Sequence, residues 1–281
     1  MQRTIKTPVS FSGAGLHLGK KQFIQLYPAE VNTGIVFKHR KSQTLIPALW
    51  QNVKTLPLCT CIVNPNAPEL YIRTIEHLLA ACYANKITNL LIEIDGLEVP
   101  ILDGSGLLFD QKLKDNIYIQ NSPRKHIKIT KTHEYKESEQ RWIKIEPANT
   151  LFIDIQIELN KFGVLRWQGE MTPEICQQEI IQARTFGRLR NGLLAKLTYF
   201  KKDPICLGAN FNSSLILVGN KAINKGGMRM PNEPIRHRVL DLLGDLMLAG
   251  GDIRGKITAS STAHRLNHQL LKKILSATNE H

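Results

Sequence analysis

The feature of this sequence that most constrains its fold is an apolar helical stretch interrupted by three ionisable side chains in a line. Apolar residues recur at helical spacing through residues 235–249. Pro234 stands where a proline is tolerated at a helix start, and Gly250 with Gly251 ends the pattern. A helix this apolar has to be buried against other elements, so its polar residues need partners.

The three residues in this line are His237, Asp241 and Asp245, spaced four residues apart. Helix positions four apart lie within about 40° of each other around the axis, so His237 and Asp241 can bind one metal ion from a single face. Asp245 lies one turn further on. Spacing alone leaves two alternatives open, a solvated polar stripe or an internal salt bridge with Arg236 or Arg238.

A second ionisable pair, Glu76 and His77, lies in the first turn of another predicted helix. This helix runs from Thr74, a plausible N-cap, to about Asn85. Adjacent helical residues point about 100° apart, so one can ligate a metal while the other stands beside its open position. Two histidines and one carboxylate leave a fourth place for water, which is typical of catalytic zinc. An exposed Glu-His pair is common, however, and indicates little by itself.

His264 lies between a predicted strand over residues 253–259 and a predicted helix over residues 266–275. Such a junction can place a side chain over a site. With a carboxylate partner, a histidine there would be protonated and could donate to a leaving amine. A surface histidine is the alternative reading.

The remaining pattern predicts an α+β protein of two similar domains, residues 1–120 and 125–281. Each domain is expected to be a sheet with helices on one face, although no sequence repeat proves a duplication. The boundary follows from a polar stretch without periodicity between about Lys112 and Lys125. The expected strands and turns cover residues 9–63, 90–94, 127–130, 142–145, 151–159 and 253–259, and residues 174–184 are expected to be helical.

Length and composition are those of a packed globular protein, with 281 residues of which 42% are hydrophobic. No run approaches the roughly 18 apolar residues of a membrane-spanning helix, and the first six residues lead into a polar stretch unlike a signal peptide. We therefore expect a cytoplasmic protein. The five cysteines are an odd number, and the one-residue gap between Cys59 and Cys61 is unlike a thiolate zinc site, so reduced, mostly buried thiols are expected.

The formal charge of +13 is uneven along the chain. Residues 1–120 carry 12 Lys/Arg against 9 Asp/Glu, a net +3, and the rest of the chain therefore carries +10. Such an excess suits an anionic partner, and nucleic acid, membrane headgroups or a phosphorylated small substrate all remain open beside simple solubility. No RNA-binding motif with interleaved aromatic residues is present, and aromatic residues are 6% of the chain.

Taken together and in this order, the motifs resemble the UDP-3-O-acyl-N-acetylglucosamine deacetylases, the zinc hydrolases of lipid A synthesis. The resemblance covers essentially residues 1–275. Each motif is weak alone, but together they make a specific pattern. They are Gly15-Leu16-His17, Leu58-Cys59-Thr60-Cys61, Thr74-Ile75-Glu76-His77-Leu78, Pro100-Ile101-Leu102-Asp103-Gly104-Ser105, Ala183-Arg184-Thr185-Phe186-Gly187, Cys206-Leu207-Gly208, Arg236-His237 with Asp241 and Gly244-Asp245-Leu246, and His264 with Leu266-Asn267.

The resemblance implies two α+β domains whose helices pack between the two sheets, with the site at their junction. It implies a monomer that acts on a small UDP-sugar and not on nucleic acid, with passing membrane proximity allowed. The roles it implies are zinc ligands at His77, His237 and Asp241 (iron(II) fits the same ligands), a general base at Glu76, a general acid at His264 oriented by Asp245, an oxyanion donor at Thr185, and substrate contacts at His17, Cys61, Arg141, Phe186 and Arg238.

Some residues depart from the pattern of that family. Arg238 stands where lysine is usual, Pro234 replaces an aromatic residue, and Ser261 replaces a lysine. Residues 160–173 are shorter than the family's insertion for the acyl chain, although Val164, Leu165 and Trp167 can still line an apolar surface. Three hypotheses stay beside the pathway enzyme: a paralogue for a short or absent acyl chain, a catalytically silent binding paralogue, and a nucleic-acid-binding protein.

Overall fold

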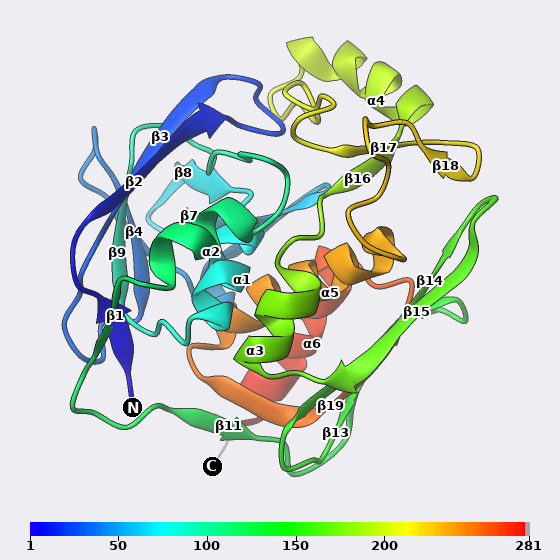
Figure 1. The fold of residues 1–281 in the computed structure, drawn as a ribbon. Coiled ribbons are helices and arrows are strands. Elements are labelled where there is room, and N and C mark those ends of the chain that lie inside the picture. Colours follow the sequence, from blue (N-terminus) through cyan, green and yellow to red (C-terminus); the bar gives the residue numbers. More distant parts are fainter. Residues whose placement is uncertain (279–281) are drawn as a thin grey trace.

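The computed structural model describes residues 1–278 as an α+β structure in which helices lie between two sheets (Figure 1). One sheet comes from the first half of the chain and the other from the second half. The expected fold class is thus confirmed. Within the described residues, no helix is long and apolar enough to cross a membrane.

The first sheet has five strands in the order β2-β3-β9-β4-β5. Its strands alternate buried and partly exposed residues, as in β3, so one face packs into the core and the other meets solvent. The strand bounds are β2 Val9–Ala14, β3 Lys21–Tyr27, β9 Leu90–Ile94, β4 Ile35–His39 and β5 Leu45–Pro47.

The second sheet has six strands in the order β12-β13-β19-β14-β15, with β11 also paired to β19. Its central strands β19 and β14 are parallel, and isoleucines on their inner face pack against the helices. The bounds are β11 His126–Lys128, β12 His133–Ser138, β13 Arg141–Glu146, β14 Leu151–Leu159, β15 Gly163–Glu170 and β19 Asp252–Ser260.

Three helices form the layer between the sheets, namely α1, α5 and α6. Helix α1 packs on α5, and α5 packs on α6 and on strands β14 and β15. Their apolar side chains join one hydrophobic core that both halves of the chain share. The bounds are α1 Glu76–Ala84, α5 Glu233–Leu246 and α6 His264–Thr278.

Smaller elements surround these layers. One three-stranded sheet joins β6 Val53–Leu56, β7 Cys59–Asn64 and β8 Ala67–Arg73, a second joins β16 Phe186–Arg188, β17 Leu215–Val218 and β18 Lys221–Ala222, and β1 Arg3–Ile5 pairs with β10 Ile117–Ile119. The short helical segments are η1 Trp50–Asn52, α2 Leu107–Leu113, α3 Pro173–Ile175, η2 Cys176–Ile180, α4 Leu189–Ala195, η3 Lys196–Phe200 and η4 Met247–Ala249.

Two predicted helix bounds are wrong. Thr74 does not cap α1, because its backbone is left-handed (φ 60°) and its hydroxyl donates to Glu98 instead (2.9 Å). The helix expected over residues 174–184 ends at Ile180 as a π-helical turn, and Arg184 lies beyond it and pairs with Glu233.

The division into residues 1–120 and 125–281 stays a prediction, which we retain as a proposal. Strand β10, which ends at Ile119, pairs with β1 at the start of the chain. Strand β11, which begins at His126, pairs with the first residues of β19, which lies near the end of the chain. The pairing partners thus change between these two strands, where the polar stretch lies.

All five cysteines are free thiols, four of them buried. The expectation of reduced, mostly buried thiols is therefore confirmed.

Candidate active site

The polar face of α5 carries the first two groups of the site. His237 and Asp241 lie one turn apart, both buried, with His237 Nε2 3.3 Å from Asp241 Oδ1. His237 Nδ1 donates to the carbonyl oxygen of Ala183 at 3.0 Å. That hydrogen bond fixes the ring orientation and leaves Nε2 free to act as a ligand when the imidazole is neutral.

Helix α1 brings His77 to the same place. The rings of His77 and His237 lie 5.1 Å apart, and His77, His237 and Asp241 offer ligand atoms that all lie within 4.8 Å of one another. The approach of α1 to α5 depends on Gly244, since a Cβ there would lie 2.1 Å from the carbonyl oxygen of Glu76. The structure therefore brings together the three residues predicted as metal ligands.

The state of these three side chains fits a divalent cation. Two buried atoms, His77 Nδ1 and Asp241 Oδ1, have no hydrogen-bond partner within residues 1–278, which is costly for a buried polar group. Burial and the neighbouring His237 lower the pKa of His77 to about 3. Burial likewise lowers the pKa of His237. Two neutral imidazoles beside an ionised carboxylate form the donor set that zinc prefers.

Glu76 stands next to this cluster, in the first turn of α1. Its Oε2 accepts from the backbone N–H of Thr60 at 3.0 Å, and its Oε1 lies 3.6 Å from His264 Nε2. Burial raises the pKa of Glu76 to about 8, which makes the carboxylate a stronger base than an exposed glutamate.

His264 begins α6 and pairs with Asp245 of α5. Its Nδ1 lies 2.9 Å from Asp245 Oδ2, which also accepts from the side-chain amide of Asn267 at 2.8 Å. Burial opposes protonation of His264, but the charges of Asp245, Asp241 and Glu76 outweigh it and raise the pKa of His264 to about 10. His264 is therefore a cation at neutral pH, with Nε2 turned toward Glu76 and Asp241.

Two further members of the site were not predicted. The Thr60 hydroxyl donates to Asp245, and His268 Nε2 lies 3.4 Å from the same carboxylate. Thr60 stands between Cys59 and Cys61 in a buried strand, so strand alternation could have identified it. His268 lies one helical turn after His264, a spacing that could have identified it too.

A small cavity of about 70 Å³ is lined by Glu76, His77, His237, Asp241 and His264. Its wall is completed by Arg238 of α5 and by residues from four other segments, which include the predicted residues His17, Thr185 and Phe186. The lining residues are Leu16, His17, Leu58, Glu76, His77, Thr185, Phe186, Cys206, His237, Arg238, Asp241 and His264.

Thr185, Phe186 and Arg238 form one side of the cavity. The backbone N–H of Thr185 donates to the Gly104 carbonyl oxygen at 2.6 Å, which holds the start of β16 in place. The Phe186 ring lies 6.0 Å from the His237 ring. The Arg238 guanidinium lies over the Phe186 ring at 5.1 Å and donates to Asp241 Oδ2 at 3.1 Å.

His17 forms part of another wall and is fully buried. Its backbone N–H donates to Glu98 at 2.8 Å, and its Nδ1 accepts from the Cys206 N–H at 3.3 Å. Burial and the nearby charge of Arg73 lower the pKa of His17 to about 3. His17 therefore faces the cavity as a neutral group and not as a cation.

Two predicted substrate contacts lie away from the cavity. Cys61 is fully buried on the face of β7 opposite Thr60, and its thiol contacts the Ile62 carbonyl oxygen at 3.7 Å. Arg141 is exposed at the start of β13 and lies 3.6 Å from Glu137. Strand alternation and the outer position of the β12–β13 hairpin account for these two differences.

The expected apolar surface on the β14–β15 hairpin is mostly absent from the described structure. The two strands pair up to Leu159 and Gly163, so the turn spans only residues 160–162. Leu165 and Trp167 are buried in the core, and Val164 alone of the three predicted residues is exposed.

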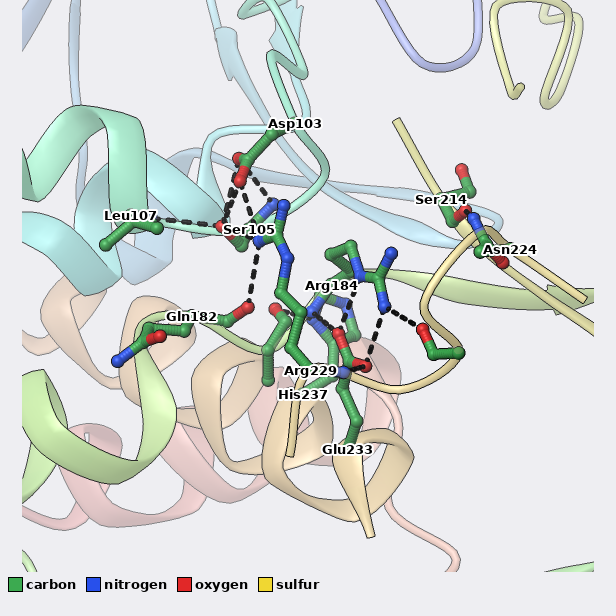
Figure 2. Close-up of polar contacts among 12 residues, drawn as sticks. Asp103, Ser105, Leu107, Gln182, Arg184, Ser214, Asn224, Arg229, Glu233 and His237 are labelled. Carbon is green, nitrogen blue, oxygen red and sulfur yellow. Dashed lines mark hydrogen bonds and ion pairs between the residues drawn. The ribbon is translucent and has the colours of Figure 1, made fainter. Parts of the chain in front are cut away.

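A network of ion pairs lies beside His237 (Figure 2). Glu233 is fully buried and accepts from Arg184 Nε at 2.8 Å, Arg184 Nη2 at 3.0 Å and the Arg184 backbone N–H at 2.9 Å. Arg229 donates to Asp103 at 2.7 Å and to the Gln182 carbonyl oxygen at 3.1 Å. Arg184 stands between Ala183, which accepts from His237, and Thr185, which lines the cavity. The network therefore fixes the segment that carries these two residues.

Comparison with known protein families agrees with this geometry. The family model described as UDP-3-O-acyl N-acetylglycosamine deacetylase matches residues 2–276, which is nearly the whole chain. The match includes every element that contributes to the cavity. The chain therefore belongs to the UDP-3-O-acyl N-acetylglycosamine deacetylase family.

Proposed function

We propose that this chain is a metal-dependent deacetylase that removes the acetyl group from the glucosamine nitrogen of a UDP-3-O-acyl-N-acetylglucosamine and releases acetate. The family is one of deacetylases of lipid A biosynthesis, so the class of reaction follows from membership. The observation that carries the finer proposal is the meeting, in one cavity, of three candidate metal ligands, the basic carboxylate of Glu76 and the cationic His264.

The metal of this proposal is zinc, with iron(II) as the alternative for the same ligands. His77, His237 and Asp241 would hold it, since their unsatisfied buried atoms and neutral imidazoles fit a cation. When bound, a divalent cation here would supply Lewis acidity to the attacking water and to the amide carbonyl.

The side chains of the cavity divide the proton transfers between them. Glu76 is the general base, because its raised pKa suits removal of a proton from water near neutral pH. His264 is the general acid and gives its Nε2 proton to the departing amine. Asp245 holds the other nitrogen of that ring and stabilises its charged form. Thr185, on the cavity wall, would donate to the oxyanion of the tetrahedral intermediate.

Different parts of the protein bear on the binding of the UDP group and on the binding of the acyl chain. Arg238 at the cavity wall and the +10 charge after residue 120 suit a UDP group. The short β14–β15 turn, with Leu165 and Trp167 in the core, favours a paralogue that takes a short or absent acyl chain as the second candidate function.

Acetate release measured together with metal content tests this proposal. Purified protein would be assayed on UDP-N-acetylglucosamine with and without a long 3-O-acyl group, beside His237→Ala. We expect one equivalent of zinc or iron and acetate release from at least one substrate, and loss of both in the variant. A wild type that binds metal and releases no acetate would identify a silent binding paralogue. A strong dependence on the long chain would exclude the short-chain candidate.

Two further expectations belong to this proposal. The enzyme is expected to act in the cytoplasm, which cell fractionation would check. It is also expected to be a monomer, which light scattering on a sizing column would check.

A further inference from the structure

The exposed apolar residues of this protein concentrate in the segment Leu189–Phe200, which comprises α4 and η3. Phe200 exposes 93% of its surface, Leu197 76% and Tyr199 67%. In Figure 1 this segment lies on the outside of the molecule, beside the small sheet of β16, β17 and β18. Exposed apolar side chains gathered in one segment in this way normally mark a site of interaction.

The apolar side chains of the segment face outward together. Leu193, Leu197 and Phe200 are spaced four and three residues apart, so they follow one side of the helical segment. Ala195 is buried and marks the opposite side, by which the segment packs on the protein. The Tyr199 ring lies 5.1 Å from the Phe200 ring and extends the same surface.

The charge along this segment is of one sign. Residues 188–202 carry five Lys/Arg and no Asp/Glu. Of these basic residues, Arg190, Lys196, Lys201 and Lys202 are exposed. The next acidic residue, Asp203, accepts a hydrogen bond from Tyr71 at 2.8 Å and is turned toward the protein. A surface that combines exposed leucines and aromatic rings with lysines complements an anionic lipid interface.

We propose that Leu189–Phe200 docks onto the surface of an anionic phospholipid bilayer. The leucines and aromatic rings would enter the region between headgroups and acyl chains, and the lysines would contact lipid phosphates. Leucines at 193, 194 and 197 favour this partner over nucleic acid, because aliphatic side chains gain by burial in hydrocarbon and not by contact with a sugar-phosphate backbone.

The position of the segment gives the docking a consequence for the cavity. Phe186 shortly before it and Cys206 shortly after it both line the cavity. A molecule docked through Leu189–Phe200 therefore has its cavity near the bilayer surface. The inference stands on exposure and charge, and does not depend on the proposed deacetylation.

Vesicle sedimentation with the full chain tests the proposal. The probes are vesicles of mixed phosphatidylglycerol and phosphatidylcholine, and vesicles of phosphatidylcholine alone. We expect the wild type to sediment with the anionic vesicles and to be released by salt. Leu197→Ser/Phe200→Ser and Lys196→Gln/Lys201→Gln/Lys202→Gln should each lower the partition coefficient at least about tenfold.

Matched variants on other surfaces provide the control. Tyr118→Ser/Ile119→Ser removes two exposed apolar residues of β10, and Lys6→Gln/Lys41→Gln/Lys114→Gln removes three exposed charges. Both should sediment like the wild type. Thermal unfolding of every variant verifies folding, so a loss of binding by the Leu197/Phe200 pair with an unchanged melting temperature supports docking.

Several results would overturn the proposal. The wild type would not sediment with anionic vesicles, or the docking and control variants would lose binding equally.

Other results would assign the surface to another partner. A dimer that Leu197→Ser/Phe200→Ser dissociates, without vesicle binding, would assign the surface to a second copy. Retention on RNA without vesicle binding would assign it to nucleic acid. If the variants weaken only the use of long-chain substrates, the segment serves the acyl chain instead. Absent acetate release with intact vesicle binding would contradict the proposed function alone.

Discussion

Two aspartates on α5, one turn apart and both buried, have opposite surroundings. Asp245 is surrounded by donors, because the Thr60 hydroxyl, the Asn267 amide and His264 all reach its oxygens. Asp241 accepts from Arg238 on one oxygen, and its other oxygen has no hydrogen-bond partner within the described part of the chain. The comparison separates a carboxylate that orients a neighbour from one left open for a ligand.

Their charge does not separate the two aspartates. Burial opposes ionisation of Asp241, but His237 and His264 hold its pKa below the usual range. Burial opposes ionisation of Asp245 too, and His264 with His268 holds its pKa below the usual range as well. Both are therefore anions at neutral pH. The difference lies in unfilled hydrogen-bond positions, and a divalent cation would fill them at Asp241.

The largest expected effect comes from Asp241→Asn. The amide keeps the shape of the carboxylate but is a poor ligand for zinc, so we expect metal content to fall below about a tenth of an equivalent. Acetate release should fall to background. Metal analysis and an acetate assay measure the two effects. Asp154→Asn, which breaks an ion pair with Arg166 on the second sheet, is the control and should keep its metal. A fully metallated Asp241→Asn would remove Asp241 from the ligand set.

The matching change at the other aspartate, Asp245→Asn, should keep the metal and slow turnover by about 10²–10³-fold. As a general acid, His264 must be protonated, so activity is present below its pKa and lost as pH rises through it. Burial opposes that protonation, while Asp245 is the largest of the charges that raise the pKa of His264. The variant's high-pH limb should therefore move to lower pH. A pH–rate profile with an unmoved limb would show that Asp245 does not act through His264.

Glu233→Gln changes the first residue of α5, which pairs with Arg184 next to the segment that orients His237. It leaves the buried Arg184 guanidinium without its partner, so we expect unfolding free energy to fall by about 3–5 kcal/mol. Since Arg184 adjoins Ala183, which accepts from His237, metal affinity should also fall about 10–100-fold.

The matched control for this change is Glu179→Gln, which breaks an exposed pair with Arg236 of the same helix. A surface pair contributes about 0–1 kcal/mol, so the control should melt and bind metal like the wild type. Urea unfolding and metal titration give both quantities. Equal losses in the two variants would contradict the special role of the buried pair.

Much of the fold was predictable, because periodicity records which faces are buried. The strands at residues 90–94 and 151–159 match their predicted bounds, and the helix of residues 235–249 begins two residues earlier than expected and ends in the turn η4. The errors arise where a buried charge recruits a local group. Thr74 leaves the cap position to donate to Glu98, and the π-helical turn ends so that Arg184 can meet Glu233.

The site shows the same division. Helical spacing placed His237 and Asp241 on one face, but no spacing could place His77 of α1 beside them, which rested on the resemblance alone. Thr60 points to the site, while its strand neighbour Cys61 lies on the opposite face, so a substrate contact by Cys61 stays a prediction. Arg141 depends on where its hairpin lies in the fold, which local sequence does not record.

The smallest expected effect comes from Gly244→Ala. It tests whether Asp241 works with a partner on α1, His77, while Asp245 works with a partner on α6, His264. The added methyl would lie 2.1 Å from the Glu76 carbonyl oxygen, and because that atom belongs to the backbone, α1 and α5 must separate slightly. Overpacking of this kind costs about 1–3 kcal/mol of unfolding free energy.

His77 comes from α1, so this separation should weaken metal binding about tenfold. The Asp245–His264 pair joins α5 to α6, and the high-pH limb should therefore stay where it is. Gly192→Ala, whose new methyl meets nothing within 4 Å, is the control. Metal titration beside a pH–rate profile decides the matter. If the high-pH limb of the pH–rate profile moves together with the loss of metal affinity, Asp241 and Asp245 form one unit. The separation of a metal ligand on the α1 side from an orienting group on the α6 side would then be wrong.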